Sequence, residues 1–298
     1  MANGNLRQVQ EAKKQVPLGA GQGGKDAGAR VFSAELWRNH MGHKAIVCLV
    51  LSLLLSCSAS AAEPVNRITI LYEAFGKTSE LQMDWGFAAL VEYGGKRILY
   101  DTGNNAERFE RNVKTLEVTL QRLDFVVISD SHGDHTSGLT YLLRVNPALT
   151  VYIPRGEWGL FGGGSPLAEA RGVESLPTHM RYFGGTPPED LRLGNPWPQG
   201  KFVVVDRLTQ VAPGIHLIPT VSRVPPTVGR RGLSLSLETP KGQILLEGCS
   251  HAGIEAILEA ARAIDERVYL VVGGLHLLFA SDPEIERLAT ALRERWKV

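Results

Sequence analysis

Short apolar runs rich in β-branched and aromatic residues recur along the chain after Arg67, and turns containing glycine, proline or asparagine separate them. Runs of this length and composition predict strands. Ten strands are expected, at residues 68–72, 87–93, 97–100, 125–129, 149–153, 202–206, 215–219, 233–238, 244–246 and 268–272.

Helical spacing interrupts these runs. A helix packed on a sheet is predicted by apolar residues at i, i+3, i+4 and i+7, namely Ile254, Ile257, Leu258 and Ala261. The last helix is expected to begin at Ser281, where a capping box and an early proline precede an apolar stripe. A third helix is expected over residues 136–143, directly after an apolar strand. Strands and helices therefore share one expected domain, residues 63–298.

The N-terminal region follows a different pattern. Residues 1–40 are rich in glycine, alanine, glutamine and lysine without a sustained apolar period, which indicates a disordered segment or a wrongly extended start. Residues 41–62 combine a short basic region, an apolar run over 45–55 and a small-residue stretch, as in a secretory signal peptide. We therefore expect a periplasmic or secreted protein. The alternatives are an uncleaved anchor or buried helix, and a lipoprotein signal with lipid on Cys57.

Residues 156–200 form an expected loop-rich insertion, because they hold many glycines and prolines with aromatic residues between them. Such a segment is a lid or substrate wall in one interpretation, and a surface excursion that packs its aromatics on the core in the other.

Composition and charge limit the classes of molecule that the chain is expected to bind. The 298 residues carry a formal net charge of +1, so the chain lacks the basic field that holds a phosphate backbone, and a small-molecule substrate is expected instead of nucleic acid. The apolar run of the leader is too short to leave a stable membrane span in the mature chain. Cys48 and Cys57 lie in the leader, so Cys249 would remain alone, either buried and inert or chemically employed. Nothing in the sequence indicates the oligomeric state.

Candidate metal ligands crowd the end of the strand predicted at 125–129. Four side chains able to bind a cation follow it within six residues: Asp130, His132, Asp134 and His135. Carboxylates and imidazoles packed this closely after an apolar strand need a cation or a hydrogen-bond network, and their nitrogens and oxygens suit zinc and its first-row neighbours. The alternative is a solvated loop that happens to hold two histidines.

This segment resembles the His-x-His-x-Asp-His signature of the metallo-β-lactamase superfamily. Residues 247–254 and 273–277 resemble the Gly-Cys-Ser-His and Gly-Gly-x-His-Leu motifs of the branch named for a dihydropterin–ribofuranosylaminobenzene phosphate synthase. The resemblance covers the chain from about Ile68 to Val298. It implies an α+β fold, a four-layer αβ/βα sandwich in which two mixed sheets pack face to face beneath outer helices.

The resemblance also implies site roles. His132 would hold a first metal ion, Asp134 and His135 a second, and Asp134 would also lie near the attacking water. His251 and His276 would complete the ligand set, and Asp101 would orient a ligand without touching metal.

Other positions stay open at this stage. Asp130 replaces the family's first histidine, so it is either a ligand that shifts preference toward Mn or Fe, or a carboxylate that orients a histidine. Cys249 stands where many relatives carry a bridging aspartate, and is either a ligand or a small buried residue. Arg223 either binds an anionic substrate or is a solvated loop residue.

These residues predict a metallo-hydrolase that holds one or two Zn²⁺ ions, with Mn or Fe as alternatives. A metal-bound hydroxide, oriented by Asp134, would attack an ester, lactone, β-lactam or phosphoester. Export argues against the branch's synthase reaction, which needs an intracellular substrate. Two alternatives remain: a non-hydrolytic exported metal- or ligand-binding protein with a degenerate site, and a thiol-based activity of Cys249.

Overall fold

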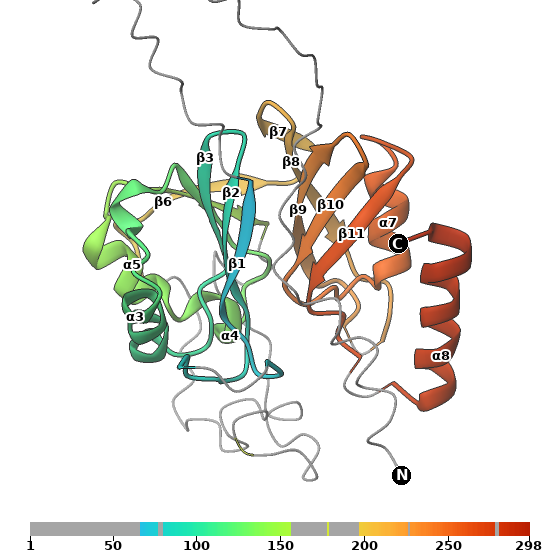
Figure 1. Ribbon diagram of the computed structural model, residues 1–298, viewed down its shortest axis with the longest axis horizontal. Coiled ribbons are helices and arrows are strands. Elements are labelled where there is room, and N and C mark those ends of the chain that lie inside the picture. Colours follow the sequence, from blue (N-terminus) through green and yellow to red (C-terminus); the bar gives the residue numbers. More distant parts are fainter. Residues whose placement is uncertain (1–65, 77–79, 156–177, 179–196, 226, 278–279) are drawn as a thin grey trace, which may run out of the picture. The chain divides into compact units, whose positions relative to one another are not determined.

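Two mixed sheets pack against each other in the computed structural model, which describes residues 66–76, 80–155, 178, 197–225, 227–277 and 280–298 (Figure 1). The expected segments 1–40 and 41–62, and nearly all of the expected insertion, lie outside the described residues. No helix within the described ranges is long and apolar enough to cross a membrane.

The first sheet has the strand order β1-β2-β3-β4-β5-β6. Its strands are β1 (Arg67–Tyr72), β2 (Ala88–Tyr93), β3 (Lys96–Tyr100), β4 (Phe125–Val127), β5 (Thr150–Pro154) and β6 (Lys201–Val205). The first three pair antiparallel, and β3 to β6 pair in parallel. Helices α3 (Ala106–Thr115) and α5 (Leu139–Val145) cover its outer face, with the short turn η2 (Leu120–Arg122) between them in sequence (Figure 1). Every residue of β4 is buried, as expected of a central parallel strand covered on both faces.

The second sheet has the order β11-β10-β9-β8-β7. Its strands are β7 (Thr209–Ala212), β8 (Ile215–Val221), β9 (Arg231–Thr239), β10 (Gly242–Glu247) and β11 (Val268–Gly273). Only β10 and β11 pair in parallel. Helices α7 (Ile254–Ala261) and α8 (Asp282–Ala291) lie on the outer side, and α8 continues into η5 (Leu292–Trp296) (Figure 1).

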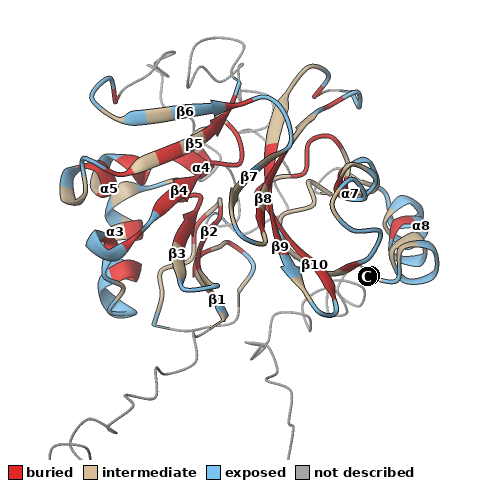
Figure 2. Cartoon of the chain, turned by 90° about the horizontal axis from the view of Figure 1, so that it is seen from above, coloured by how far each residue is buried: buried red, intermediate tan, exposed pale blue. Residues whose placement is uncertain are grey.

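The inner faces of both sheets are buried, and Figure 2 shows buried residues concentrated in the central strands and on the helix sides that face them. Direct hydrogen bonds join the sheets at one end. The Tyr100 hydroxyl donates to the Leu233 carbonyl at 2.9 Å, and the Leu233 N–H donates to the Ser129 carbonyl at 2.7 Å. The ends of β3 and β4 are thereby held against β9.

All ten expected strands are confirmed, with ends shifted by at most two residues, and so are the helix at 254–261 and the capping box at Ser281. Strand β7 and helix α3 were not expected. The four residues of β7 include only two apolar side chains, and half of the residues of α3 are charged, with only Phe109, Asn112 and Val113 buried. Trp197, from the expected insertion, packs in the core beside Thr140.

The helix expected at 136–143 is present but divided into two helices. The chain forms α4 (Gly133–Thr136) and then α5, with a break at Ser137 and Gly138. A Cβ atom on Gly138 would lie 2.2 Å from the Thr102 carbonyl oxygen, so the chain passes too close to its neighbour for any larger residue. The helix thus begins earlier than expected and includes Asp134 and His135.

Candidate metal centre

The first sheet contributes donors from the turn between β4 and α4. The buried Asp130 follows the strand, and its Oδ1 accepts a hydrogen bond from the backbone N–H of His132 at 2.8 Å. His132 stands at the N-cap position of α4, and His135 lies inside that helix. This tight turn brings the three side chains together, as the sequence predicted.

The second sheet contributes donors from the loops after β10 and β11. Cys249 and His251 follow β10, and His276 follows β11. Ser250 Oγ donates to the Gly274 carbonyl at 2.8 Å and so ties the two loops together. Ser250 and His276 both have left-handed backbone conformations, with φ of 53° and 52°. Non-glycine residues rarely adopt this conformation, and such residues cluster at functional sites.

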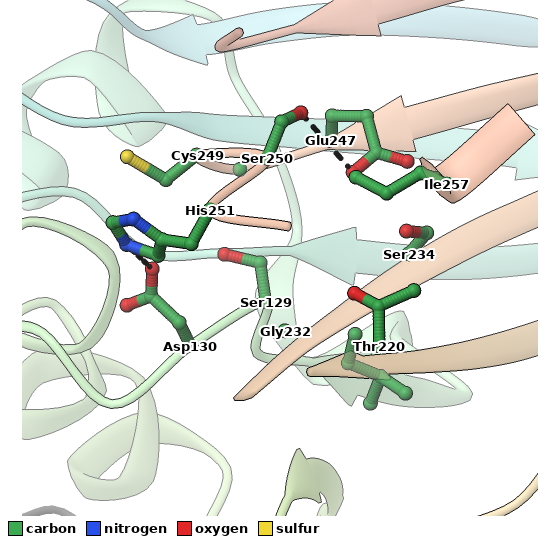
Figure 3. Close-up of a pocket in the computed structure, with 12 residues that line it drawn as sticks. Ser129, Asp130, Thr220, Gly232, Ser234, Glu247, Cys249, Ser250, His251 and Ile257 are labelled. Atoms are coloured by element: carbon green, nitrogen blue, oxygen red, sulfur yellow. Dashed lines mark hydrogen bonds and ion pairs between the residues drawn. The ribbon is translucent and has the colours of Figure 1, made fainter. Parts of the chain in front are cut away.

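The donors of the two sheets meet in three overlapping groups, whose potential ligand atoms lie within 4.8 Å of one another in each group. The groups are Asp130, His132 and His251; Asp130, His135 and Cys249; and Cys249, His251 and His276. Figure 3 shows the contact between His251 Nε2 and Asp130 Oδ2, which is 3.0 Å long. Asp130, Cys249 and His251 each belong to two groups, so the cluster is continuous across both sheets.

The cluster contains polar atoms that its own hydrogen bonds leave unsatisfied. Among the described residues, His135 Nε2 and His251 Nδ1 are buried without a hydrogen-bond partner. A buried polar nitrogen without a partner is costly. Imidazole, carboxylate and thiol groups together are also the donors that zinc and other first-row cations prefer. The residues therefore fit a metal ion.

The electrostatics favour added positive charge. Burial alone would raise the pKa of Asp130, but the imidazoles of His135 and His132 hold it well below its usual range. Burial alone would lower the pKa of His135, but Asp130 and Asp134 raise it well above its usual value. Burial is outweighed in the same way at His251, where Cys249 and Asp130 raise the pKa to about 10. The carboxylates thus stabilise positive charge in the cluster, and a bound metal ion would replace the protons on the histidines.

Asp101, which the sequence predicted to orient a ligand, lies directly after β3 and contacts His135. Its Oδ1 accepts from the Ser129 N–H at 2.6 Å. Its Oδ2 accepts from Ser129 Oγ and lies 2.7 Å from His135 Nδ1. When Nδ1 donates this bond, the Nε2 atom of His135 keeps its lone pair toward the cluster.

Asp134 and Arg223 stand outside the three groups. Asp134 is buried, and its Oδ2 accepts from Trp85 Nε1 at 2.9 Å while lying 3.3 Å from His135 Nε2. It is therefore beside the cluster with its orientation set by Trp85. Arg223 is exposed in the loop after β8 and makes no hydrogen bond or ion pair with a described residue.

Two residues near the cluster were not predicted. The Arg230 guanidinium contacts the His132 ring, with Nη1 3.4 Å from Nδ1 and a hydrogen bond to Nε2. Glu247, at the end of β10, lines a small cavity behind Asp130 and His251, and burial raises its pKa to about 8 (Figure 3). A glutamate directly after the apolar run 244–246 was a usable signal for Glu247, whereas only the loop geometry reveals the place of Arg230.

Comparison with known proteins gives consistent likenesses. The model of the family described as the metallo-beta-lactamase superfamily matches residues 86–246. The 7,8-dihydropterin-6-methyl-4-(beta-D-ribofuranosyl)-aminobenzene-5'-phosphate synthase of Methanocaldococcus jannaschii is 25% identical over 259 residues, which cover 77% of this chain and 83% of the relative. A crystal structure described as a metal-dependent hydrolase of the beta-lactamase superfamily has a TM-score of 0.55 and 25% identity, covering 77% of this chain and 84% of that chain.

Proposed function

Because the chain belongs to the metallo-beta-lactamase superfamily and has its two-sheet fold, we propose that it is a metal-dependent hydrolase. The observation that carries the proposal is the pair of buried nitrogens without a hydrogen-bond partner, His135 Nε2 and His251 Nδ1, inside a cluster of anionic and imidazole donors from both sheets. Cations bound in this cluster would satisfy such atoms.

The overlapping groups suggest how two cations would be held. Asp130, His132 and His251 would bind one ion. His135 and Cys249 would bind a second, with Asp130 near both, and His276 would complete the set from the loop after β11. We propose Zn²⁺ because thiolate and imidazole donors suit it, with Mn or Fe as alternatives.

The bound cation would supply Lewis-acid activation of water and of the substrate's carbonyl or phosphoryl group. The chain's own residues would do the remaining work. Asp134 would accept a hydrogen bond from the attacking water and orient it, while Trp85 keeps the Asp134 carboxylate in place. Asp101 would keep the His135 ring in one tautomer. Water would attack directly, without a covalent intermediate on the enzyme, at an ester, lactone, β-lactam or phosphoester.

Metal removal tests this proposal. Purified protein should contain a first-row metal by elemental analysis, should lose hydrolysis of an ester, lactone, β-lactam and phosphoester panel on chelation, and should regain it when Zn²⁺, Mn²⁺ or Fe²⁺ is restored. His132→Ala should lose both metal and turnover. His216→Ala is the control, because His216 lies in β8 against Glu238 and outside the cluster. Turnover by verified metal-free protein would refute the mechanism, and metal-loaded protein without hydrolysis would favour a binding or synthase role.

Export through residues 41–62 is a separate part of the proposal. It is supported by the basic, apolar and small-residue order of that segment. The mass of the protein from a periplasmic fraction should match a chain that begins after Ala61. A full-length cytoplasmic product would contradict it.

A further inference from the structure

In the loop between β8 and β9, hydrogen bonds join the described residues 222–225 and 227–230 to one another. The Ser222 N–H donates to the Arg230 carbonyl at 2.7 Å, and the Gly229 N–H donates back to the Ser222 carbonyl at 2.9 Å. The Arg230 N–H donates to the Thr227 carbonyl at 3.0 Å. The backbone of Arg230 is therefore fixed at the point where β9 begins.

The same loop is attached to the candidate metal centre. Thr227 is buried, and its Oγ1 lies 2.8 Å from Ser222 Oγ and can donate to the Val224 carbonyl at 2.9 Å or to the His251 carbonyl at 3.2 Å. His251 belongs to two of the three donor groups. The position of Arg230 relative to the centre thus depends on a direct link between this loop and a proposed ligand.

The Arg230 side chain reaches the same centre at His132. Its Nη1 is 3.4 Å from His132 Nδ1 and hydrogen-bonds to Nε2. A guanidinium is always charged and only donates hydrogen bonds, so it occupies the lone pair with which a neutral His132 would bind a cation. A cation held by His132 would displace the guanidinium from that lone pair, and the hydrogen-bonded backbone of Arg230 would keep the side chain within reach of the centre.

A permanent positive charge in this place has one clear use. The planar guanidinium donates two parallel hydrogen bonds to a carboxylate or phosphate. We propose that Arg230 binds an oxyanion group of the substrate beside the metal centre, so that the enzyme acts on anionic substrates and not on neutral ones. This inference rests on the proposed function, because it places the group next to a metal-activated bond. It assigns to Arg230 the role that the sequence suggested for Arg223.

Titration with inorganic phosphate and with acetate tests the inference. Zinc-loaded protein is compared with its Arg230→Met, Arg230→Lys and Arg122→Met variants by calorimetry, with metal content measured in every sample. Arg122 is the matched control, because it is an exposed arginine in η2. Because hydrogen bonds to a charged group are strong, we expect Arg230→Met to bind the anion about tenfold or more weakly than the parent does. Arg230→Lys should retain part of the affinity, and Arg122→Met should match the parent. If the parent binds phosphate more tightly than acetate, the oxyanion group of the substrate is a phosphate. The reverse order identifies a carboxylate.

The outcomes separate this inference from the proposed function. Equal anion affinity in the parent and Arg230→Met at equal metal content would overturn the role of Arg230 and leave the metal centre standing. Protein that binds no metal would instead refute the proposed function. Phosphate binding by that metal-free protein, lost in Arg230→Met and kept in Arg122→Met, would still assign the anion site to Arg230, and its absence would overturn that assignment too.

Discussion

The donor set of the candidate metal centre depends most on whether Cys249 binds the ion. Its sulfur belongs to two of the three donor groups, one shared with Asp130 and His135 and one with His251 and His276. A thiolate in that position would give the site a soft donor. We predict that the Co²⁺-substituted protein shows a sulfur-to-cobalt charge-transfer absorption in the near ultraviolet. Cys249→Ser should lose this band while retaining the weaker visible bands of bound Co²⁺.

The measurement needs a chain without other thiols. Cys48 and Cys57 lie before residue 63, so protein that begins at Glu63 carries Cys249 alone. A charge-transfer band that survives in Cys249→Ser, or that never forms in the parent, would show that Cys249 does not bind the ion. In the second case, unchanged turnover of Cys249→Ser would also exclude a thiol-based activity.

Asp101 acts on the centre through His135. Asp101→Asn keeps the shape but places an amide against His135 Nδ1, 2.7 Å away, and the neutral group no longer favours the correct tautomer. Loss of such a supporting carboxylate lowers metal affinity about 10–100-fold in other proteins. Competition with a chelator should reveal a loss of this size. Asp206→Asn, at an exposed carboxylate paired with Arg155, should leave the affinity unchanged. An Asp101→Asn protein with parental affinity would remove Asp101 from the site.

At the scale of elements, the ends of four strands supply the whole cluster. Asp101 follows β3, the turn with Asp130 follows β4, Cys249 follows β10 and His276 follows β11. Glycines permit these segments to approach. A Cβ atom on Gly248 would lie 1.9 Å from Ser129 Oγ and 2.5 Å from Asp101 Oδ2.

Gly248→Ala should therefore destabilise the fold and disturb the support of His135. Overpacking of this kind costs about 1–3 kcal/mol of unfolding free energy, measurable by denaturant titration, and metal affinity should fall with it. Gly232→Ala is the matched control, because its added Cβ would lie no closer than 3.4 Å to Thr220 Oγ1. Equal stability of the two variants would contradict the close packing at Gly248.

The sequence predicted these elements well because most strands are continuous apolar runs with clear turns. It also predicted that residues 130–135, His251 and His276 would meet, through the strand ends and the family resemblance. It did not predict α3, whose few buried side chains contact the core from a charged helix. Arg230 was equally out of reach, since its contact with His132 joins positions 98 residues apart. At the break between α4 and α5, Gly138 lies close to the Thr102 carbonyl, and no local sequence pattern reveals this contact.

For the whole molecule, the centre is a joint between two sheets. Asp130, His132 and His135 come from one sheet, while Cys249, His251 and His276 come from the other. The hydrogen bonds of Tyr100 and Ser129 with Leu233 also join the two sheets. An ion bound by both sets should stabilise the assembled fold.

We predict that metal at 100 times its dissociation constant raises the free energy of unfolding by about 2.7 kcal/mol. For a chain of this size that is roughly 5–10 °C in Tm, readable by calorimetry with and without chelator. His135→Ala and His251→Ala should each reduce the shift, because each removes a donor of one proposed ion and the two donors come from different sheets. His216→Ala should keep it. A full shift in either of the first two variants would show that the substituted histidine does not hold a stabilising ion.

Three non-glycine residues of the centre, Asp101, Ser250 and His276, share the left-handed backbone conformation. The consequence concerns protein engineering. Copying the donor side chains onto another scaffold would reproduce the chemistry only if the recipient also bends its backbone in the same sense at all three positions. Libraries that diversify this protein should accordingly leave these three residues unchanged and direct randomisation to the loop that carries Arg230.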